Sequence, residues 1–353
     1  MHRILLFFLR KKRIIPADSN RLKVISLLML LFIFSATGFF YFEFPENPDL
    51  TWTDAIWWTL VTMTTVGYGD YFPVTAAGRY LVGIPTMIFG IGFLGYIISE
   101  VSSKLIESRS KRIKGMTKIK ANGHILIINY NHLENILKLT RELKSDQSTA
   151  HKEICLIDET LSELPRELLK ENVMFVRGNP TREDTLKQAN IADASHAIIL
   201  SKDSGNPHSD DQNLATTLVL ENLNPDIFSI VEVIDPDKIK QIELAGCDSA
   251  VCVTELTANL VIQELQDPGV KNIIHELISN QFGFQIYFLP VNKMLTWEFK
   301  ELVLWGLDNH YSVLGVIRDS QAKLSCLPTE KIQNSDKAIV IGQERIAGIE
   351  ISA

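Results

Sequence analysis

The sequence predicts two joined folds: an α-helical membrane module with two spans and a re-entrant helix, then an α/β Rossmann-like domain with a small α+β C-terminal lobe. Three features of the 353 residues indicate this. Residues 24–42 and 80–99 contain no charge, short apolar runs alternate with amphipathic stretches over 124–254, and shorter alternating stretches follow residue 281. A chain of this length can hold two or three domains.

The two uncharged runs are long enough to cross a membrane, because about 20 helical residues cover a hydrocarbon core of about 30 Å. A buried core helix is the alternative for either run. The first run lies too far from the N-terminus, and lacks the cleavage site, of a secretory signal. Basic residues dominate 1–23 and 101–120, whereas the segment between the runs is mostly acidic. This bias predicts a cell (plasma) membrane protein with both termini in the cytoplasm.

The segment between the spans contains a short apolar helix. Residues 51–63, TWTDAIWWTLVTM, hold no Pro or Gly, and Thr53 or Asp54 can cap a helix there. The stretch is too short to span and is long enough to re-enter the membrane. Non-helical backbone at membrane depth persists only when it is buried in protein or lines a watery cavity. The next residues, TTVGYGD at 64–70, are therefore expected to line a pore.

The backbone of TTVGYGD suits a bare potassium ion. Carbonyls of residues 65–68 can supply rings of oxygen in place of the hydration shell, if four chains meet on one axis. Gly67 and Gly69 permit the left-handed dihedrals that turn successive carbonyls to one side. The Thr65 hydroxyl can add one more ring of oxygens.

The side chains of the same stretch are expected to fix its width. Val66 and Tyr68 would point outward and wedge against Trp57 and Trp58. A Gly-rich external turn is the alternative, but it leaves the re-entrant segment unexplained.

TVGYG is the signature filter of potassium channels, and residues 20–100 resemble their two-helix pore module. The resemblance implies a potassium-selective homotetramer with potassium ions in the filter. The implied filter residues are Thr65, Val66, Gly67, Tyr68, Gly69 and Asp70. Some members pair the terminal Asp with a carboxylate in the pore helix. Val61 occupies that position here, which puts inactivation based on that pair in doubt.

The second span is rich in glycine. In the resembled channels a Gly in the middle of this helix lets it splay toward the cytoplasm, and Gly90 aligns best with that gating hinge. Close packing of small residues against a neighbouring helix is the alternative. The chain has no arginine-studded helix, so voltage sensing of the usual kind is not expected.

The rest of the chain is predicted to be cytosolic. Residues 101–123 form a basic linker, and 124–254 alternate apolar runs with helices, which implies a doubly wound parallel sheet. A helical connector covers 255–280, and 281–353 form the small lobe. The four cysteines, Cys155, Cys247, Cys252 and Cys326, all fall in this part and are interpreted as core residues.

Residues 124–353 resemble the RCK (regulator of potassium conductance) domain of prokaryotic channels. The resemblance rests on VRGNPTREDTL after the third strand and on LPTEKIQNSDKAIVIGQERI in the tail. It implies a gating ring of eight such domains, whose ligand pulls on the pore helices through the linker. Four chains supply only four domains. An internal start at Met116 could supply the others, although that Met is more simply incidental.

One ligand hypothesis is a nucleotide. Dinucleotide binding uses G-x-G-x-x-G after the first strand, but residues 129–134 read NYNHLE, so conventional NAD binding is disfavoured. Asn129, Asn131 and Asp158 could still bind a polar group at the strand ends, where such sheets bind ligands. A solvated loop acid is the alternative for Asp158.

The other ligand hypothesis is calcium, which needs six or more oxygens. The candidates follow the fourth and fifth strands: Asp203, Asp210, Asp211, Glu232, Asp235 and Asp237. Of these, only Glu232 clearly matches the acids of the calcium-gated RCK channels. Scattered surface acids are the alternative.

Together these features predict a potassium channel gated by calcium or a nucleotide, and not an enzyme. A net charge of −7 argues against a basic nucleic-acid-binding body, and the basic flanks favour membrane lipid. Three other functions are weighed. They are a constitutive leak channel with a structural RCK domain, a membrane-anchored NAD-dependent enzyme, and a subunit of a multi-chain transporter.

Overall fold

The computed structural model describes residues 17–291, 297–319, 321–346 and 348–349. The chain forms two compact units, Met1–Arg109 and Ser110–Ala353. Most of the basic N-terminal segment predicted at 1–23 lies outside the described residues.

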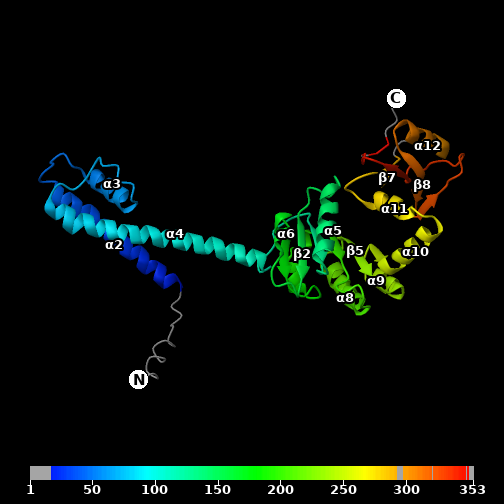
Figure 1. Cartoon of the computed structure of the whole chain (residues 1–353), viewed down its shortest axis with the longest axis horizontal. Coiled ribbons are helices and arrows are strands. Elements are labelled where there is room, and N and C mark those ends of the chain that lie inside the picture. Colours follow the sequence, from blue (N-terminus) through cyan, green and yellow to red (C-terminus); the bar gives the residue numbers. More distant parts are fainter. Residues whose placement is uncertain (1–16, 292–296, 320, 347, 350–353) are drawn as a thin grey trace, which may run out of the picture. The chain divides into compact units, whose positions relative to one another are not determined.

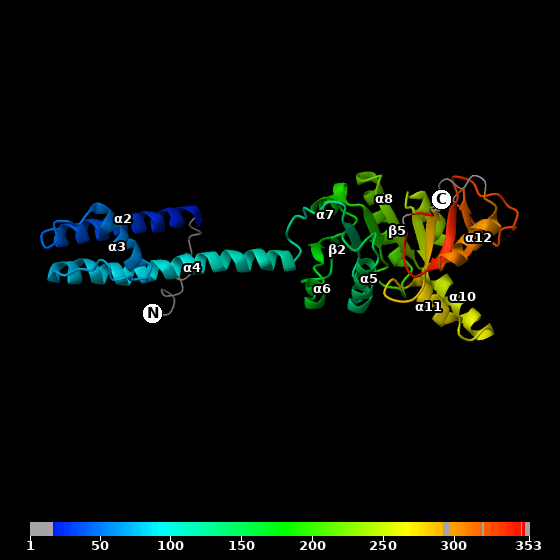
Figure 2. The same cartoon turned by 90° about the horizontal axis from the view of Figure 1, so that it is seen from above.

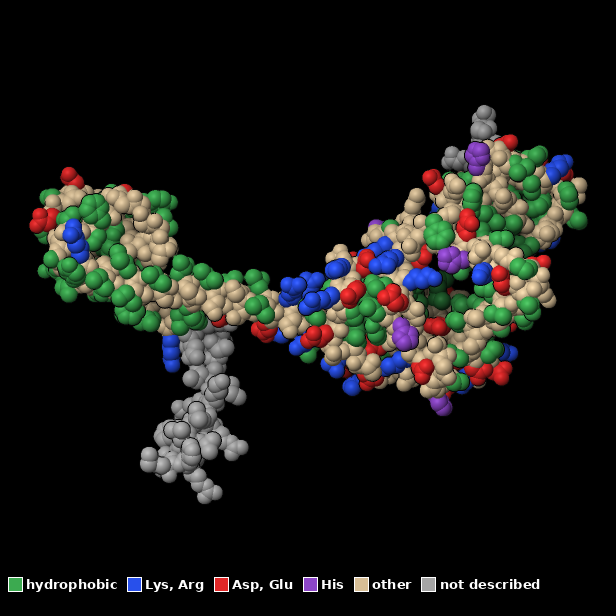
Figure 3. Space-filling model, viewed as in Figure 1, with side chains coloured by type: hydrophobic (Ala, Val, Ile, Leu, Met, Phe, Trp, Pro, Cys, Tyr) green, Lys and Arg blue, Asp and Glu red, His purple; other side chains and the backbone are tan. Residues whose placement is uncertain are grey.

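The described part of the first unit is built from helices, the last of which continues a few residues into the second unit (Figure 1). They are α2 (Ala17–Glu43), α3 (Trp52–Met63) and α4 (Ile84–Ile113), and a π-helical turn η1 (Gly78–Gly83) leads into α4. Two segments, Lys23–Glu43 and Gly78–Ile113, are long and apolar enough to cross a membrane. Hydrophobic side chains cover much of the visible surface of this unit (Figure 3), as expected of a surface that faces lipid or neighbouring helices.

The cap of helix α3 lies two or three residues earlier than expected. The cap is Thr51, whose hydroxyl accepts from the Asp54 N–H, while the Asp54 carboxylate accepts from the Thr51 N–H at 2.9 Å. The prediction of Thr53 or Asp54 as the cap was therefore wrong, because Asp54 fills the third helical position of a reciprocal capping box. Trp58 of α3 stacks on Phe39 of α2, with ring centroids 4.1 Å apart, and both side chains are buried.

The second unit begins with a six-stranded parallel sheet in the order β3-β2-β1-β4-β5-β6 (Figures 1 and 2). Its strands are β1 (Ile125–Ile128), β2 (Ile154–Asp158), β3 (Met174–Arg177), β4 (His196–Ile199), β5 (Phe228–Val233) and β6 (Ser249–Cys252). Its helices are α5 (Leu133–Ser145), α6 (Arg166–Lys170), α7 (Glu183–Gln188), α8 (His208–Leu223) and α9 (Ile239–Leu244), with 3-10 turns η2 (Ile191–Asp193) and η3 (Pro236–Lys238). Strands β1 and β2 are buried throughout, as continuous apolar strands covered on both faces should be. The doubly wound Rossmann-like sheet is confirmed.

Two helices, α10 (Val253–Gln266) and α11 (Val270–Ile278), follow the sheet. The C-terminal lobe pairs its strands antiparallel in the order β7-β10-β8-β9, and a helix precedes β8. Its elements are β7 (Gln285–Pro290), α12 (Phe299–Asp308), β8 (Ser312–Arg318), β9 (Gln321–Leu324) and β10 (Lys337–Gly342). All four cysteines are unpaired and buried, in agreement with their interpretation as core residues.

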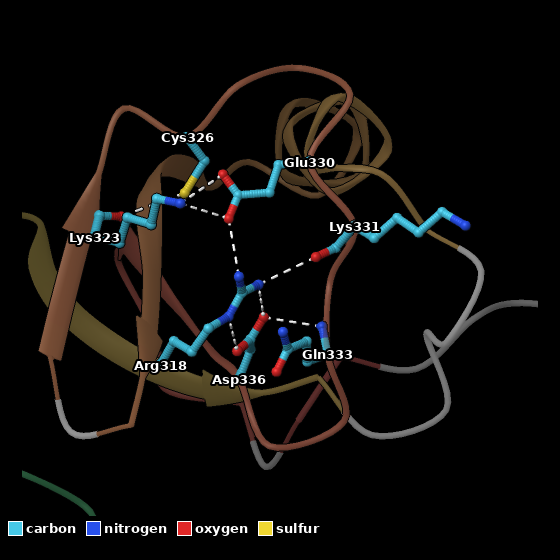
Figure 4. A network of polar contacts seen from close by, with 7 residues as sticks. All are labelled: Arg318, Lys323, Cys326, Glu330, Lys331, Gln333 and Asp336. Atoms are coloured by element: carbon cyan, nitrogen blue, oxygen red, sulfur yellow. Dashed lines mark hydrogen bonds and ion pairs between the residues drawn. The ribbon is translucent and has the colours of Figure 1, made fainter.

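A polar network fixes the loops of this lobe (Figure 4). Arg318 donates from Nε and one terminal nitrogen to the two oxygens of Asp336, at 2.9 and 2.7 Å, and from the other to Glu330 at 2.9 Å. Asp336 is almost fully buried and also accepts from the Gln333 N–H. Burial alone would raise the Asp336 pKa, but the hydrogen bonds from Arg318 and Gln333 hold that pKa below its usual value.

Candidate functional site

The turn that follows α3 alternates in backbone handedness. Thr65, Gly67 and Gly69 have φ angles of 60°, 55° and 78°, whereas the residues between them do not have positive φ. Two N–H groups, those of Val66 and Gly67, donate back to the Val61 carbonyl at 3.0 and 3.3 Å. Within the described part of the chain, no donor bonds to the backbone carbonyls of 65–68. The N–H groups of Val66 and Gly67 are thus bonded within the chain, whereas the carbonyl oxygens of 65–68 can accept bonds from another group.

One aromatic wall supports this turn. The Tyr68 and Trp57 rings stack with centroids 5.8 Å apart and planes 3° from parallel. Trp57 also donates from Nε1 to Asp70 Oδ2 at 2.7 Å. Asp70 thus bonds to an indole rather than to a carboxylate, and Val61 contributes only backbone. Trp58 stacks on Phe39, and it also lines a cavity together with Thr65 and Gly67 of the turn. Its expected contact with Val66 or Tyr68 stays a prediction.

A buried carboxylate fixes the segment that leaves the turn. Glu43, at the end of α2, accepts from the Val74 N–H at 2.9 Å and from the Thr75 hydroxyl at 2.7 Å. A Cβ on Gly78 would lie 2.0 Å from Glu43 Oε1, so a larger residue at this position would displace the Glu43 carboxylate. Glu43 is one of the acids of the segment between the spans, and its sequence position alone did not indicate this role. The sequence features that could have indicated this role are Thr75, which supplies a hydrogen-bond donor, and Gly78 three residues later, which leaves space for the carboxylate.

Gly90 marks a close approach inside the first unit. A Cβ there would lie 2.8 Å from Met63 Cα, at the end of α3, whereas nothing lies within 4 Å of the equivalent position on Gly92 or Gly95 among the described residues. Helix α4 is continuous through Gly90. The observed contact is the packing alternative to the hinge, and the hinge itself stays a prediction.

In the second unit, the candidate nucleotide residues meet at the carboxyl ends of β1 and β2. Asn129 is buried with a φ of 73°, and its Nδ2 donates to the Leu200 carbonyl at 2.8 Å. The buried Asp158 carboxylate accepts three backbone N–H groups, from Tyr130, Thr160 and Leu161, at 3.0, 2.7 and 2.7 Å. Its oxygens are thus engaged with its own chain.

Asn131 lies in the loop that follows β1. Its Oδ1 accepts from the His132 N–H at 2.6 Å, and its Nδ2 reaches the Ser201 carbonyl at 3.5 Å. The structure brings Asn129, Asn131 and Asp158 to one edge of the sheet and uses them to tie neighbouring loops together.

The candidate calcium residues lie along the same edge, after β4 and β5. Buried Asp210 accepts from the Ile234 and Asp235 N–H groups at 3.1 and 2.9 Å. Glu232 accepts from the Ser201 N–H at 3.0 Å, and a cavity of about 580 Å³ opens beside it. Ser204, Ile234 and residues of α10 complete its lining.

The remaining acids have local partners. Asp211 accepts from Lys238 Nζ at 2.8 Å, and this ion pair lowers the Asp211 pKa. Asp203 and Asp235 each accept from an N–H two residues onward, at 3.0 Å in both cases. Across the described ranges, no group of three or more His, Cys, Asp or Glu side chains is arranged to hold a metal ion.

Two family models match the chain. The ion channel family matches residues 27–107, and the TrkA-N domain family matches residues 137–253. The putative potassium channel protein YugO of Bacillus subtilis is 29% identical over 82% of this chain and 86% of its own length. The calcium-gated potassium channel TvoK of Thermoplasma volcanium is 32% identical over 70% of this chain and 71% of its own length.

The chain belongs to the potassium channels that carry a TrkA-N, or RCK, domain. The family confirms the predicted resemblance and the predicted order of a helical pore module and a Rossmann-like RCK domain. A solved structure of the human SLO3 gating ring aligns with 62% of this channel and 44% of that chain, at 15% identity and a TM-score of 0.50. That likeness shows a shared fold.

Proposed function

We propose that this potassium channel conducts through the turn 65–70 of four identical chains and is gated by an intracellular ligand of its RCK domain. One observation carries the pore assignment: alternating positive φ at 65, 67 and 69 leaves consecutive carbonyls without intrachain donors. Four copies around an axis would surround a potassium ion with rings of such oxygens. Thr65, Val66, Gly67, Tyr68, Gly69 and Asp70 are the proposed filter.

The surroundings of the turn support a rigid filter. Trp57 holds both Tyr68 and Asp70, and Glu43 holds the segment beyond. Helix α3 ends at Met63, directly before the turn, and the partial negative charge at a helix C-terminus favours a cation nearby. These contacts would hold the width of the filter constant.

The proposed assembly places the apolar surfaces of α2 and α4 against lipid and neighbouring chains. Both termini would be cytoplasmic, and the RCK domains would form a ring, with further copies starting at Met116 as one route to eight. Gly90 is the proposed hinge about which α4 would splay, because glycine weakens the helical backbone at that position.

Calcium is the ligand we favour, because TvoK is named a calcium-gated channel and Glu232 borders a cavity. Asp210 is already bound to two backbone N–H groups, so Glu232 and Asp203 are the better candidates among the predicted acids. Oxygens from a second chain or from moved loops would have to complete the shell. A nucleotide at Asn129 and Asp158 is the second candidate, since both lie at the strand ends beside the β1–β4 switch point.

Potassium flux through the purified channel in liposomes tests both halves of the proposal. We expect flux selective for potassium over sodium that changes with about 1 mM calcium on the RCK side, the weak end of protein calcium affinities. Non-selective flux would overturn the filter. Selective flux that ignores calcium but follows an added nucleotide would move the ligand to Asn129 and Asp158. Selective flux that changes with neither calcium nor a nucleotide would favour the alternative of a constitutive leak channel.

A further inference from the structure

The segment that joins α4 to β1 is fastened to the RCK domain along its length. We call residues 113–124 the strap. Two of its N–H groups, those of Ile119 and Gly123, donate to the carbonyls of Gln188 and Asp193 at 2.9 and 2.7 Å. Both acceptors belong to the short region formed by α7 and η2.

Two amide side chains of that region hold the strap carbonyls. Gln188 Nε2 donates to the Gly115 carbonyl at 2.9 Å and to the Thr117 carbonyl at 3.3 Å. Asn190 Nδ2 donates to the Ala121 carbonyl at 2.8 Å. Asn190 has a φ of 59°, so it makes this hydrogen bond from a left-handed backbone conformation.

Both ends of the strap are also held. The Ile113 carbonyl, at the end of α4, accepts from the Leu164 N–H at 2.9 Å. At the other end, the His124 carbonyl accepts from the Ser195 N–H at 2.9 Å. Between them Ile119 and Ala121 are buried in the core of the sheet domain. A strap held by its backbone and by two core side chains moves with the domain.

The elements that hold the strap also reach the carboxyl edge of the sheet. The Gly178 N–H donates to the Asp158 carbonyl at 3.0 Å, and a Cβ on Gly178 would lie 2.5 Å from Thr185 Oγ1 of α7. The loop after β3 is thus wedged between the edge residue Asp158 and α7. Three residues beyond Thr185, Gln188 holds the strap.

We propose that Gln188 and Asn190 are coupling residues, which fasten the strap to α7 and η2 so that movement of the carboxyl edge is passed to α4. The proposal rests on the proposed ligand gating. Residues 113–124 then act as a rigid extension of the domain rather than as a flexible tether. The movement is passed to α4 at its last turn, where the strap begins at Ile113.

The test is a double variant of the full-length channel, Gln188→Glu with Asn190→Gly. The first change keeps the size of the side chain but points carboxylate oxygens at two carbonyls. The second removes the amide, and glycine tolerates the positive φ. The matched control is Gln241→Glu with Asn172→Gly, because Gln241 is exposed on α9 and Asn172 is an exposed residue with a φ of 56°.

Two readouts decide the outcome: hydrogen exchange of peptides covering the strap, and potassium flux in liposomes without and with 1 mM calcium. We expect about tenfold faster exchange in the strap of the double variant. We also expect unstimulated flux that differs several-fold from that of the unaltered channel, and a smaller calcium response. The control pair should match the unaltered channel in all three.

Unchanged exchange in the strap would overturn the proposal, because the two amides would then not fasten it. Faster exchange with unchanged unstimulated flux would overturn it as well, because a loosened strap would not affect the pore. A channel that is insensitive to calcium before any substitution would refute calcium gating alone, since exchange and unstimulated flux still decide the role of the strap.

Discussion

Residues 65–70 are the proposed filter and are called the filter turn here. This turn and the carboxyl edge of the RCK sheet both gather polar groups, and they treat them in opposite ways. In the turn, the N–H groups of Val66 and Gly67 are bonded inward and the carbonyls are left without intrachain donors. At the sheet edge, the carboxylates of Asp158 and Asp210 accept two or three backbone N–H groups each. The number of polar residues does not distinguish the two regions. What distinguishes them is whether the polar atoms lack partners within the chain and so can bind a ligand.

The comparison also separates two uses of positive φ. In the filter turn, three alternating positions of positive φ accompany carbonyls that accept no hydrogen bond from the described residues. At the sheet edge, the single position Asn129 places an amide between two strand ends, where it bonds to Leu200 and Asn213. The same backbone conformation exposes oxygens in one region and closes a loop in the other.

The largest expected effect comes from Gly67→Ala in the filter turn. Nothing lies within 4 Å of the added Cβ, so the substitution acts through the φ of 55°, which an L side chain disfavours by about 1–2 kcal/mol. We expect selectivity for potassium over sodium to be lost while the tetramer still forms. Flux of the two ions in liposomes measures this. Gly269→Ala is the control, because Gly269 also has positive φ and open surroundings. Selectivity retained in Gly67→Ala would contradict the filter assignment.

Asp158→Asn tests whether the sheet-edge carboxylate is structural. Asparagine would replace one acceptor oxygen with an NH₂ group that faces N–H donors. We expect the free energy of unfolding of the RCK domain to fall by about 2–3 kcal/mol. Chemical denaturation followed by circular dichroism would report it. Unchanged stability together with a lost nucleotide response would instead make Asp158 a ligand residue and would erase the contrast with the filter.

Glu232→Gln tests the one predicted acid that borders a cavity. If Glu232 binds calcium, the substitution should raise the calcium concentration for half-maximal response about tenfold, the loss typical of one charged ligand. Glu243→Gln on α9 is the control for the change in net charge. An unshifted response would mean that Glu232 only ties β5 to the Ser201 N–H.

A smaller effect is expected from pH on the C-terminal lobe, where Asp336 is another fully engaged carboxylate. Its folded pKa lies below its usual value of 3.8, so the stabilisation is present above that value and is lost as pH falls through the folded pKa. We expect stability that is insensitive to this group above about pH 5 and that declines below about pH 4, by no more than about 1.4 kcal/mol per pH unit. Thermal melts of the full-length channel and of Asp336→Asn over this pH range would measure the decline. The variant should lack the part of the pH dependence that comes from Asp336.

The sequence predicted the fold well because its signals are local. Uncharged runs mark helices, buried apolar runs mark parallel strands, and the glycines of TTVGYGD mark left-handed backbone. It did not predict the stacking of Trp58 on Phe39 or the role of Glu43, since both depend on which helix packs against which. The acids after β4 and β5 look alike in sequence. Only the fold shows that Asp210 is buried against backbone N–H groups while Glu232 borders a cavity.

The π-helical turn Gly78–Gly83 has a consequence for how this channel is aligned with its relatives. A π turn holds about one residue more than an α turn, so it is equivalent to a single-residue insertion and rotates the following helix by about 100°. Two residues that contact other elements lie beyond this turn: Thr86, which bonds to Ser35 of α2, and Gly90, which meets Met63. Deleting one residue between Thr75 and Gly83 would preserve a helix yet turn both positions away. In a sequence alignment, a one-residue gap placed within Gly78–Gly83 therefore changes which side of α4 each later residue faces.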